Sequence, residues 1–105
     1  MMNFGLSEEN TQTILETIRP YKEIEQAVIF GSRAMGNFKP TSDIDIALKG
    51  NISQTVINKI WGFLNDEAPR FPYKVDVLDY NAISNAELRK YIDTYGKVFF
   101  DRAKH

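Results

Sequence analysis

Apolar residues recur every three or four positions in three segments of the chain, the spacing that places them on one side of a helix. The first segment begins after Ser7, a residue type that caps helix N-termini, and ends before Pro20. The other two helices are predicted over 53–67 and 84–95, each capped by the serine at its first position. Glu87 stands three residues after the serine that opens the last segment, which is the spacing of a capping box.

Four shorter apolar or alternating runs predict strands, because strand side chains point in turn to opposite faces of a sheet. These runs are 27–30, 44–48, 73–78 and 98–100, with a brief helical turn over 32–36 after the first. Helices and strands therefore alternate along the chain, which predicts an α+β fold: a small mixed β-sheet with helices packed on it. For a chain of 105 residues we expect a single domain, spanning residues 1–105.

The composition excludes several classes of function. A net charge of −1 gives no general attraction to nucleic acid or to an anionic membrane, and no stretch approaches the roughly 18 apolar residues of a membrane span. Residues 1–5 lack the basic and apolar regions of a signal peptide, so we expect a cytoplasmic protein. Cysteine is absent and the one histidine is His105, which excludes cysteine chemistry and argues against a Ser-His-Asp triad.

Three aspartates stand on predicted strands or directly before one. Asp43 and Asp45 are two residues apart, so their side chains point to the same face, roughly 6.5 Å from each other along the strand. Asp76 lies in the third strand and joins them if the two strands are neighbours. Three carboxylates without a histidine favour two Mg²⁺ ions, or Mn²⁺, over zinc, and two such ions assist an in-line phosphoryl displacement. We expect the first two acids to hold the metal on a triphosphate, and Asp76 to help activate the acceptor hydroxyl.

A Gly-Ser pair precedes these acids and predicts the phosphate-binding half of the site. Gly31 ends a strand where the backbone turns sharply, and Ser32 follows at a helix N-terminus, where free N–H groups favour an anion. Gly36 permits a left-handed turn after that short helix, and Arg33 is a nearby cation that can reach the triphosphate. We expect these four residues to bind the nucleotide.

Gly31-Ser32, ten intervening residues, Asp43-Ile44-Asp45 and the later Asp76 together resemble the DNA polymerase β-type nucleotidyltransferase superfamily. Within it the chain is most similar to the minimal nucleotidyltransferases (MNT), the antitoxin-like half of HEPN/MNT pairs. The resemblance implies the superfamily's fold, an NTP donor, and two divalent metals held by the three acids. It also implies a type VII-like antitoxin activity: transfer of AMP from ATP to a tyrosine of a helical HEPN partner, which silences an RNase toxin.

One position departs from the family pattern, because Met35 stands where many relatives carry arginine. The chain also leaves little length for holding an acceptor, which favours a partner chain that supplies it, in a homo- or hetero-oligomer.

Other interpretations remain open. In a purely structural interpretation, Gly31 ends a strand, Ser32 caps a helix, and the aspartate pair is solvated at a strand edge. A binding module that neutralises a helical partner by contact, or half of an antibiotic-modifying enzyme, are further alternatives. Trp61 and Phe63 fit either a base-stacking platform or a place in the core or an interface, and Asp79 is predicted to be a turn residue.

Overall fold

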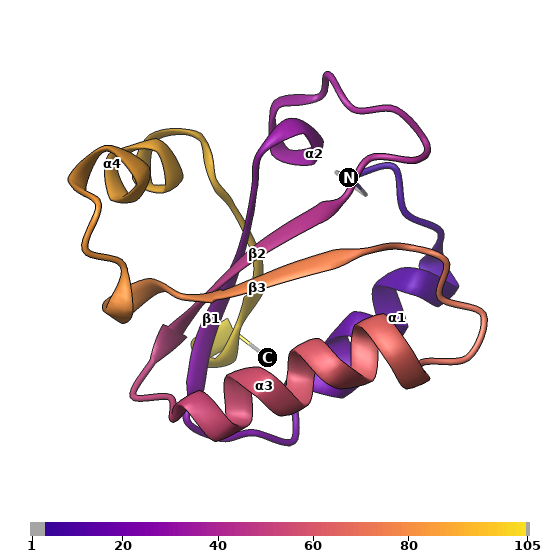
Figure 1. Cartoon of the computed structure of the whole chain (residues 1–105), viewed down its shortest axis with the longest axis horizontal. Coiled ribbons are helices and arrows are strands. Elements are labelled where there is room, and N and C mark those ends of the chain that lie inside the picture. Colours follow the sequence, from indigo (N-terminus) through magenta and orange to yellow (C-terminus); the bar gives the residue numbers. More distant parts are fainter. Residues whose placement is uncertain (1–3, 105) are drawn as a thin grey trace.

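The computed structural model describes residues 4–104, so His105 and the first three residues lie outside the description. Helices and strands alternate along the chain, as predicted (Figure 1). The elements are α1 (Glu8–Ile18), β1 (Ile24–Phe30), α2 (Ser32–Met35), β2 (Ile44–Gly50), α3 (Gln54–Gly62), a π-helical turn (Phe63–Glu67), β3 (Val75–Asp79), α4 (Ala86–Tyr95) and β4 (Lys97–Asp101), with 3₁₀ turns at Tyr80–Ala82 and Arg102–Lys104. No helix within this range has the length and hydropathy of a membrane span.

The four strands form one mixed sheet in the order β3-β2-β1-β4. β1 pairs antiparallel with β2 and with β4, whereas β2 and β3 run parallel. The parallel pair is joined through α3, because parallel neighbours require a crossover. The α+β class with a small mixed sheet is therefore confirmed.

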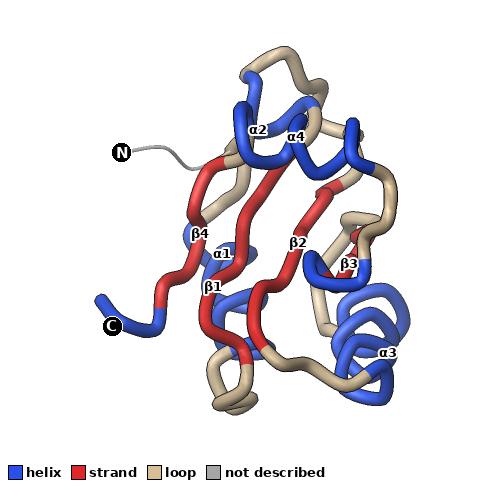
Figure 2. The backbone as a smooth tube through the Cα atoms, turned by 90° about the vertical axis from the view of Figure 1, so that its left-hand side faces the viewer, coloured by secondary structure: helices blue, strands red, loops and turns tan. Residues whose placement is uncertain are grey.

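The sheet separates two apolar clusters. The larger one lies on the face covered by α1 and α3, where both helices bury isoleucines such as Ile14 and Ile60. The smaller one lies on the other face, where Val28, Phe30 and Ala47 pack with Ile92 of α4. Figure 2 shows α1 behind the strands, and α4 in front at the end of the sheet that also carries α2. Because the smaller cluster covers only part of its face, the rest of that face is available for polar side chains.

The helix caps confirm two of the three predicted serines and correct the third. Ser7 and Ser53 accept hydrogen bonds from backbone N–H groups three residues on, at 3.1 Å and 3.3 Å. α4 begins one residue later than expected, and its cap is Asn85, not Ser84. The Asn85 Oδ1 accepts from two helix N–H groups, those of Glu87 at 2.9 Å and of Leu88 at 3.0 Å. Asn85 therefore satisfies two N–H groups of the first turn that have no partner within the helix.

This cap assignment predicts different effects for two adjacent substitutions. Asn85→Ala should lower the free energy of unfolding by about 1 kcal/mol, because two N–H groups lose their acceptor. Ser84→Ala should leave the same quantity nearly unchanged. Urea unfolding followed by circular dichroism measures both, and an equal loss in the two variants would contradict the assignment.

Candidate active site

The site begins at the turn between β1 and α2. Gly31 has φ 78° and ψ −156°, a left-handed conformation that favours glycine. A Cβ atom at this position would overlap the Oδ2 atom of Asp45, so the absent side chain also makes room for that carboxylate. α2 then starts at Ser32 and ends at Gly36, which has φ 85°. The Gly-Ser pair and the second glycine therefore have the backbone roles expected of them, and Asp45 lies directly against the turn.

The parallel pairing of β2 with β3 brings two of the aspartates side by side. Asp45 and Asp76 are register partners, and neighbouring strands lie about 4.8 Å apart. Ile44 and Ile46 flank Asp45 and are buried in the larger cluster, so Asp45 points to the opposite face, the one on which α4 lies. Asp43 is exposed and lies in the loop, one residue before β2 begins, rather than within the strand.

The pKa of Asp45 is affected by the two neighbouring acids. Partial burial raises the pKa of its carboxyl, and the negative charges of Asp76 and Asp43 raise the same pKa further. The three acids therefore share one electrostatic environment although they come from a loop and two strands.

The carboxylates are close, but they do not form a closed ligand shell. Within residues 4–104, no three Asp, Glu, His or Cys side chains converge as metal ligands. Like charges repel, which favours rotamers that keep the acids apart. Their donor atoms nevertheless suit hard divalent cations such as Mg²⁺ and Mn²⁺, which prefer oxygen ligands. Asp43, Asp45 and Asp76 are thus the residues that fit such ions by chemistry and by backbone position.

Arg33 differs from its expected role as a triphosphate ligand. Its side chain is only 2% exposed. The guanidinium donates to the carbonyl of Ser42 through two nitrogens, at 2.8 Å and 3.1 Å, and to that of Phe4 at 2.8 Å. The same group lies over the rings of Tyr73 and Phe38, at 4.9 Å and 5.1 Å from their centroids. Arg33 therefore fixes the loop that leads to Asp43, instead of facing a ligand.

Partners close in sequence do not by themselves explain why Arg33 is buried. Two of the groups that surround the guanidinium, Phe4 and Tyr73, lie 29 and 40 positions away, and only folding brings them there. Met35, where many relatives carry arginine, is 49% exposed. Its Sδ atom accepts a hydrogen bond from the hydroxyl of Tyr91 in α4, at 3.1 Å.

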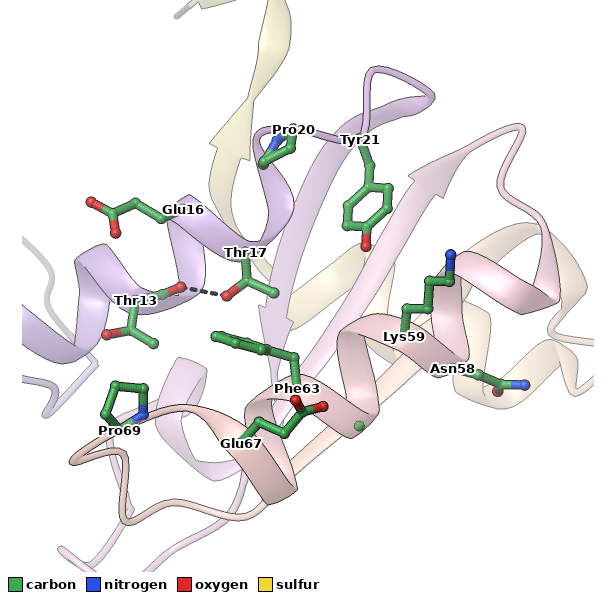
Figure 3. A pocket seen from close by; sticks show the side chains of 11 residues that line it. Thr13, Glu16, Thr17, Pro20, Tyr21, Asn58, Lys59, Phe63, Glu67 and Pro69 are labelled. Atoms are coloured by element: carbon green, nitrogen blue, oxygen red, sulfur yellow. Dashed lines mark hydrogen bonds between the residues drawn. The ribbon is translucent and has the colours of Figure 1, made fainter.

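A cavity of about 710 Å³ lies between α1 and α3, away from the acids (Figure 3). The ring of Phe63 points into it, flanked by Thr17 of α1, and none of the three aspartates lines it. Phe63 therefore lies on the far side of the sheet from the acids and cannot stack on a base held beside them. Trp61 is 44% exposed, so it is not a core residue. Asp79 is the last residue of β3 and also caps the 3₁₀ turn that follows, because its Oδ1 accepts from the N–H of Asn81 at 3.1 Å.

The fold and these acids define a class of protein. The chain belongs to the Polymerase beta, Nucleotidyltransferase family, whose family model matches residues 12–105. No curated protein sequence matches it significantly.

Solved structures with the same fold include several toxin–antitoxin complexes. One is a toxin–antitoxin complex with AMP-PNP (TM-score 0.72, 22% identity, 90% of this chain and 76% of the other). Another is a tri-AMPylated HEPN toxin from Shewanella oneidensis bound to its MNT antitoxin (TM-score 0.68, 20% identity, 94% and 76%). A third is a variant of a toxin–antitoxin complex of MntA in which two aspartates, two positions apart, are changed to glutamate (TM-score 0.67, 19% identity, 94% and 76%).

The role of Arg33 can be tested by a substitution that keeps its charge. Arg33→Lys should lower the free energy of unfolding by about 1–3 kcal/mol, because one ammonium group cannot reach the same carbonyls or stack on two rings. Thermal and urea unfolding without nucleotide measure the loss, with Arg70→Lys at an exposed position as the control. Unchanged stability in Arg33→Lys would show that the side chain is not an anchor.

The raised pKa of Asp45 predicts how stability depends on pH. The folded state holds this proton more tightly than the unfolded state, whose pKa is about 3.9. The contribution of Asp45 to the free energy of unfolding is therefore fully present below the pKa of the unfolded state. It is lost as the pH rises through the higher pKa of the folded state. Without metal, Asp45→Asn should be more stable than the wild type at pH 7, by about 1 kcal/mol or less because the site is partly solvated. The gain should vanish near pH 3, and Asp66→Asn at an exposed helix position should show none; a loss of stability at pH 7 would overturn this prediction.

Proposed function

We propose that this chain is a metal-dependent nucleotidyltransferase that moves AMP from ATP to a tyrosine hydroxyl of a helical HEPN partner, in the cytoplasm, as an antitoxin. The observation that carries the proposal is the register of Asp45 against Asp76, beside a Gly-Ser turn that leaves room for the first carboxylate. Membership of the nucleotidyltransferase family supports transferase activity in general.

Each site residue has a role in this proposal. Asp43 and Asp45 would hold the cation that accompanies the triphosphate, and Asp76 would hold a second cation for the acceptor hydroxyl. When bound, the two Mg²⁺ ions supply charge stabilisation for the attacking and leaving oxygens. Gly31 and Ser32 would bring backbone N–H groups and a hydroxyl to the phosphates, since the turn lies directly against Asp45. Arg33 supports the site from within and takes no part in binding.

The donor and the acceptor are inferred from the neighbours and from charge. One neighbour was crystallised with AMP-PNP, and another contains a HEPN toxin that carries three AMP groups. The paired aspartates changed in a third neighbour have the spacing of Asp43 and Asp45. A net charge of −1 disfavours a nucleic-acid acceptor, which would require several Lys or Arg contacts to phosphate. A tyrosine hydroxyl, with a pKa near 10, needs less activation than a serine hydroxyl.

The proposal predicts a covalent product. With ATP, Mg²⁺ and its helical partner, the wild type should add one or more AMP groups to the partner, as seen by intact-mass spectrometry. Asp43→Asn, Asp45→Asn and Asp76→Asn should each lower the rate by at least about 100-fold, because each removes a cation ligand.

Asp79→Asn is the matched control, since it lies on the same strand as Asp76 and its Oδ1 atom only caps a turn. This variant should retain transfer. If the partner's mass stays unchanged while the two proteins still bind tightly, the chain neutralises its partner by contact and is not a transferase.

A further inference from the structure

Asn65, in the π-helical turn after α3, makes a two-point contact with the backbone of β3. Its Nδ2 atom donates to the carbonyl of Val75 at 2.9 Å, and its Oδ1 atom accepts from the N–H of the same residue at 2.9 Å. The second Nδ2 hydrogen is directed to the carbonyl of Trp61, at 2.8 Å. The amide therefore uses both donors and its acceptor, which fixes its orientation.

Val75 is the residue of β3 that needs such a partner. β3 lies at the edge of the sheet and pairs only with β2. The N–H of Ile44 donates to the carbonyl of Lys74 at 2.9 Å. In a parallel ladder, the residue next to one that faces the neighbouring strand points its own N–H and C=O away from it. The polar backbone groups of Val75 thus point out of the sheet, where Asn65 takes the place of a missing strand.

The turn that carries Asn65 has an unusual geometry. The N–H of Ala68 donates to the carbonyl of Phe63 at 2.8 Å, an i to i+5 bond that widens the turn. Leu64 stays buried in the core while the next residue, Asn65, reaches the sheet edge. π-helical turns are rare and are found frequently at functional sites. In Figure 1 the end of α3 and the start of β3 lie on the same side of the molecule.

We propose that Asn65 is a positioning residue for Asp76: it holds the first residue of the edge strand, so that the next residue lies opposite Asp45. This inference rests on the proposed function, because it concerns the arrangement of the same acids. Three carboxylates that repel one another tend to separate. β3 is an edge strand that pairs on one side only, so it is the strand of the site that can move most easily. The amide of Asn65 opposes that movement without touching the nucleotide or the acceptor.

The test compares Asn65→Ala with two variants of the same helix. Asn58→Ala makes the same change at an exposed amide that bonds only to the side chain of Gln54. Ile57→Val removes a buried methyl group and lowers stability but leaves the Asn65 amide and its hydrogen bonds to Val75 in place. Three quantities are measured at a temperature where every variant is folded: hydrogen exchange of the Val75 amide, the affinity for Mn²⁺ alone by electron paramagnetic resonance, and the Mg²⁺ dependence of AMP transfer.

Asn65→Ala should speed exchange at Val75 by about tenfold or more, since that N–H loses its only acceptor. It should also weaken Mn²⁺ binding and slow transfer by about 10- to 100-fold, the range found when a supporting partner of a ligand is removed. Both control variants should keep the wild-type Mn²⁺ affinity. Asn65→Asp keeps the volume and the acceptor of the Val75 N–H but loses both donors, so a carboxylate oxygen then faces the Val75 carbonyl. It should lose Mn²⁺ affinity and slow transfer with a smaller rise in Val75 exchange, and it replaces the alanine variant if that one does not fold.

Faster exchange at Val75 with unchanged Mn²⁺ affinity and unchanged Mg²⁺ dependence would overturn the inference and leave the proposed function intact. Equal losses in Ile57→Val would overturn it too, because general stability would then be the cause. If the wild type binds Mn²⁺ but transfers no AMP, the proposed function fails, and the Mn²⁺ affinities still decide the role of Asn65. A wild type that binds no Mn²⁺ contradicts the positioning role directly.

Discussion

The parallel pairing of β2 with β3 is the constraint on which the candidate site depends. Its register places Asp45 opposite Asp76, and a slip of β3 by one residue would turn Asp76 into the core. The same register buries Ile46 and Val77 on the other face, against α1 and α3. Apolar packing on one side of the sheet therefore determines where the charged side chains lie on the other side. It holds the acids close together although their like charges repel.

Two side chains outside the acid cluster support this arrangement from its two ends. Arg33 binds the carbonyl of Ser42, one residue before Asp43, and Asn65 binds both backbone groups of Val75, one residue before Asp76. Each contact joins backbone to a half-buried or buried side chain, so each is shielded from competing water. The repulsion among the acids is thus opposed by a neutral and a cationic side chain that bind the backbone next to the acids and are not themselves part of the acid cluster.

Local patterns in the sequence were sufficient for most of the fold and for the acids. Alternating and apolar runs located all four strands. The positions of Asp43, Asp45 and Asp76 indicated a shared site, and the sheet register places Asp45 opposite Asp76. The predictions that failed depended on distant contacts or on small shifts of an element boundary. The α4 cap moved to Asn85 because its side chain reaches two N–H groups, and Arg33 turned inward because Phe4 and Tyr73 surround it.

The sequence by itself determined which residues alternate, where the chain turns at Gly31, and which carboxylates are candidates for the site, since these properties depend on residue type and close neighbours along the chain. Only the tertiary structure decided that β2 and β3 are adjacent and parallel, that Arg33 is an anchor, and that Phe63 faces α1 on the far side of the sheet from the acids. Those features come from contacts between segments far apart in sequence, and such contacts exist only once the two faces of the sheet have been buried against their helices.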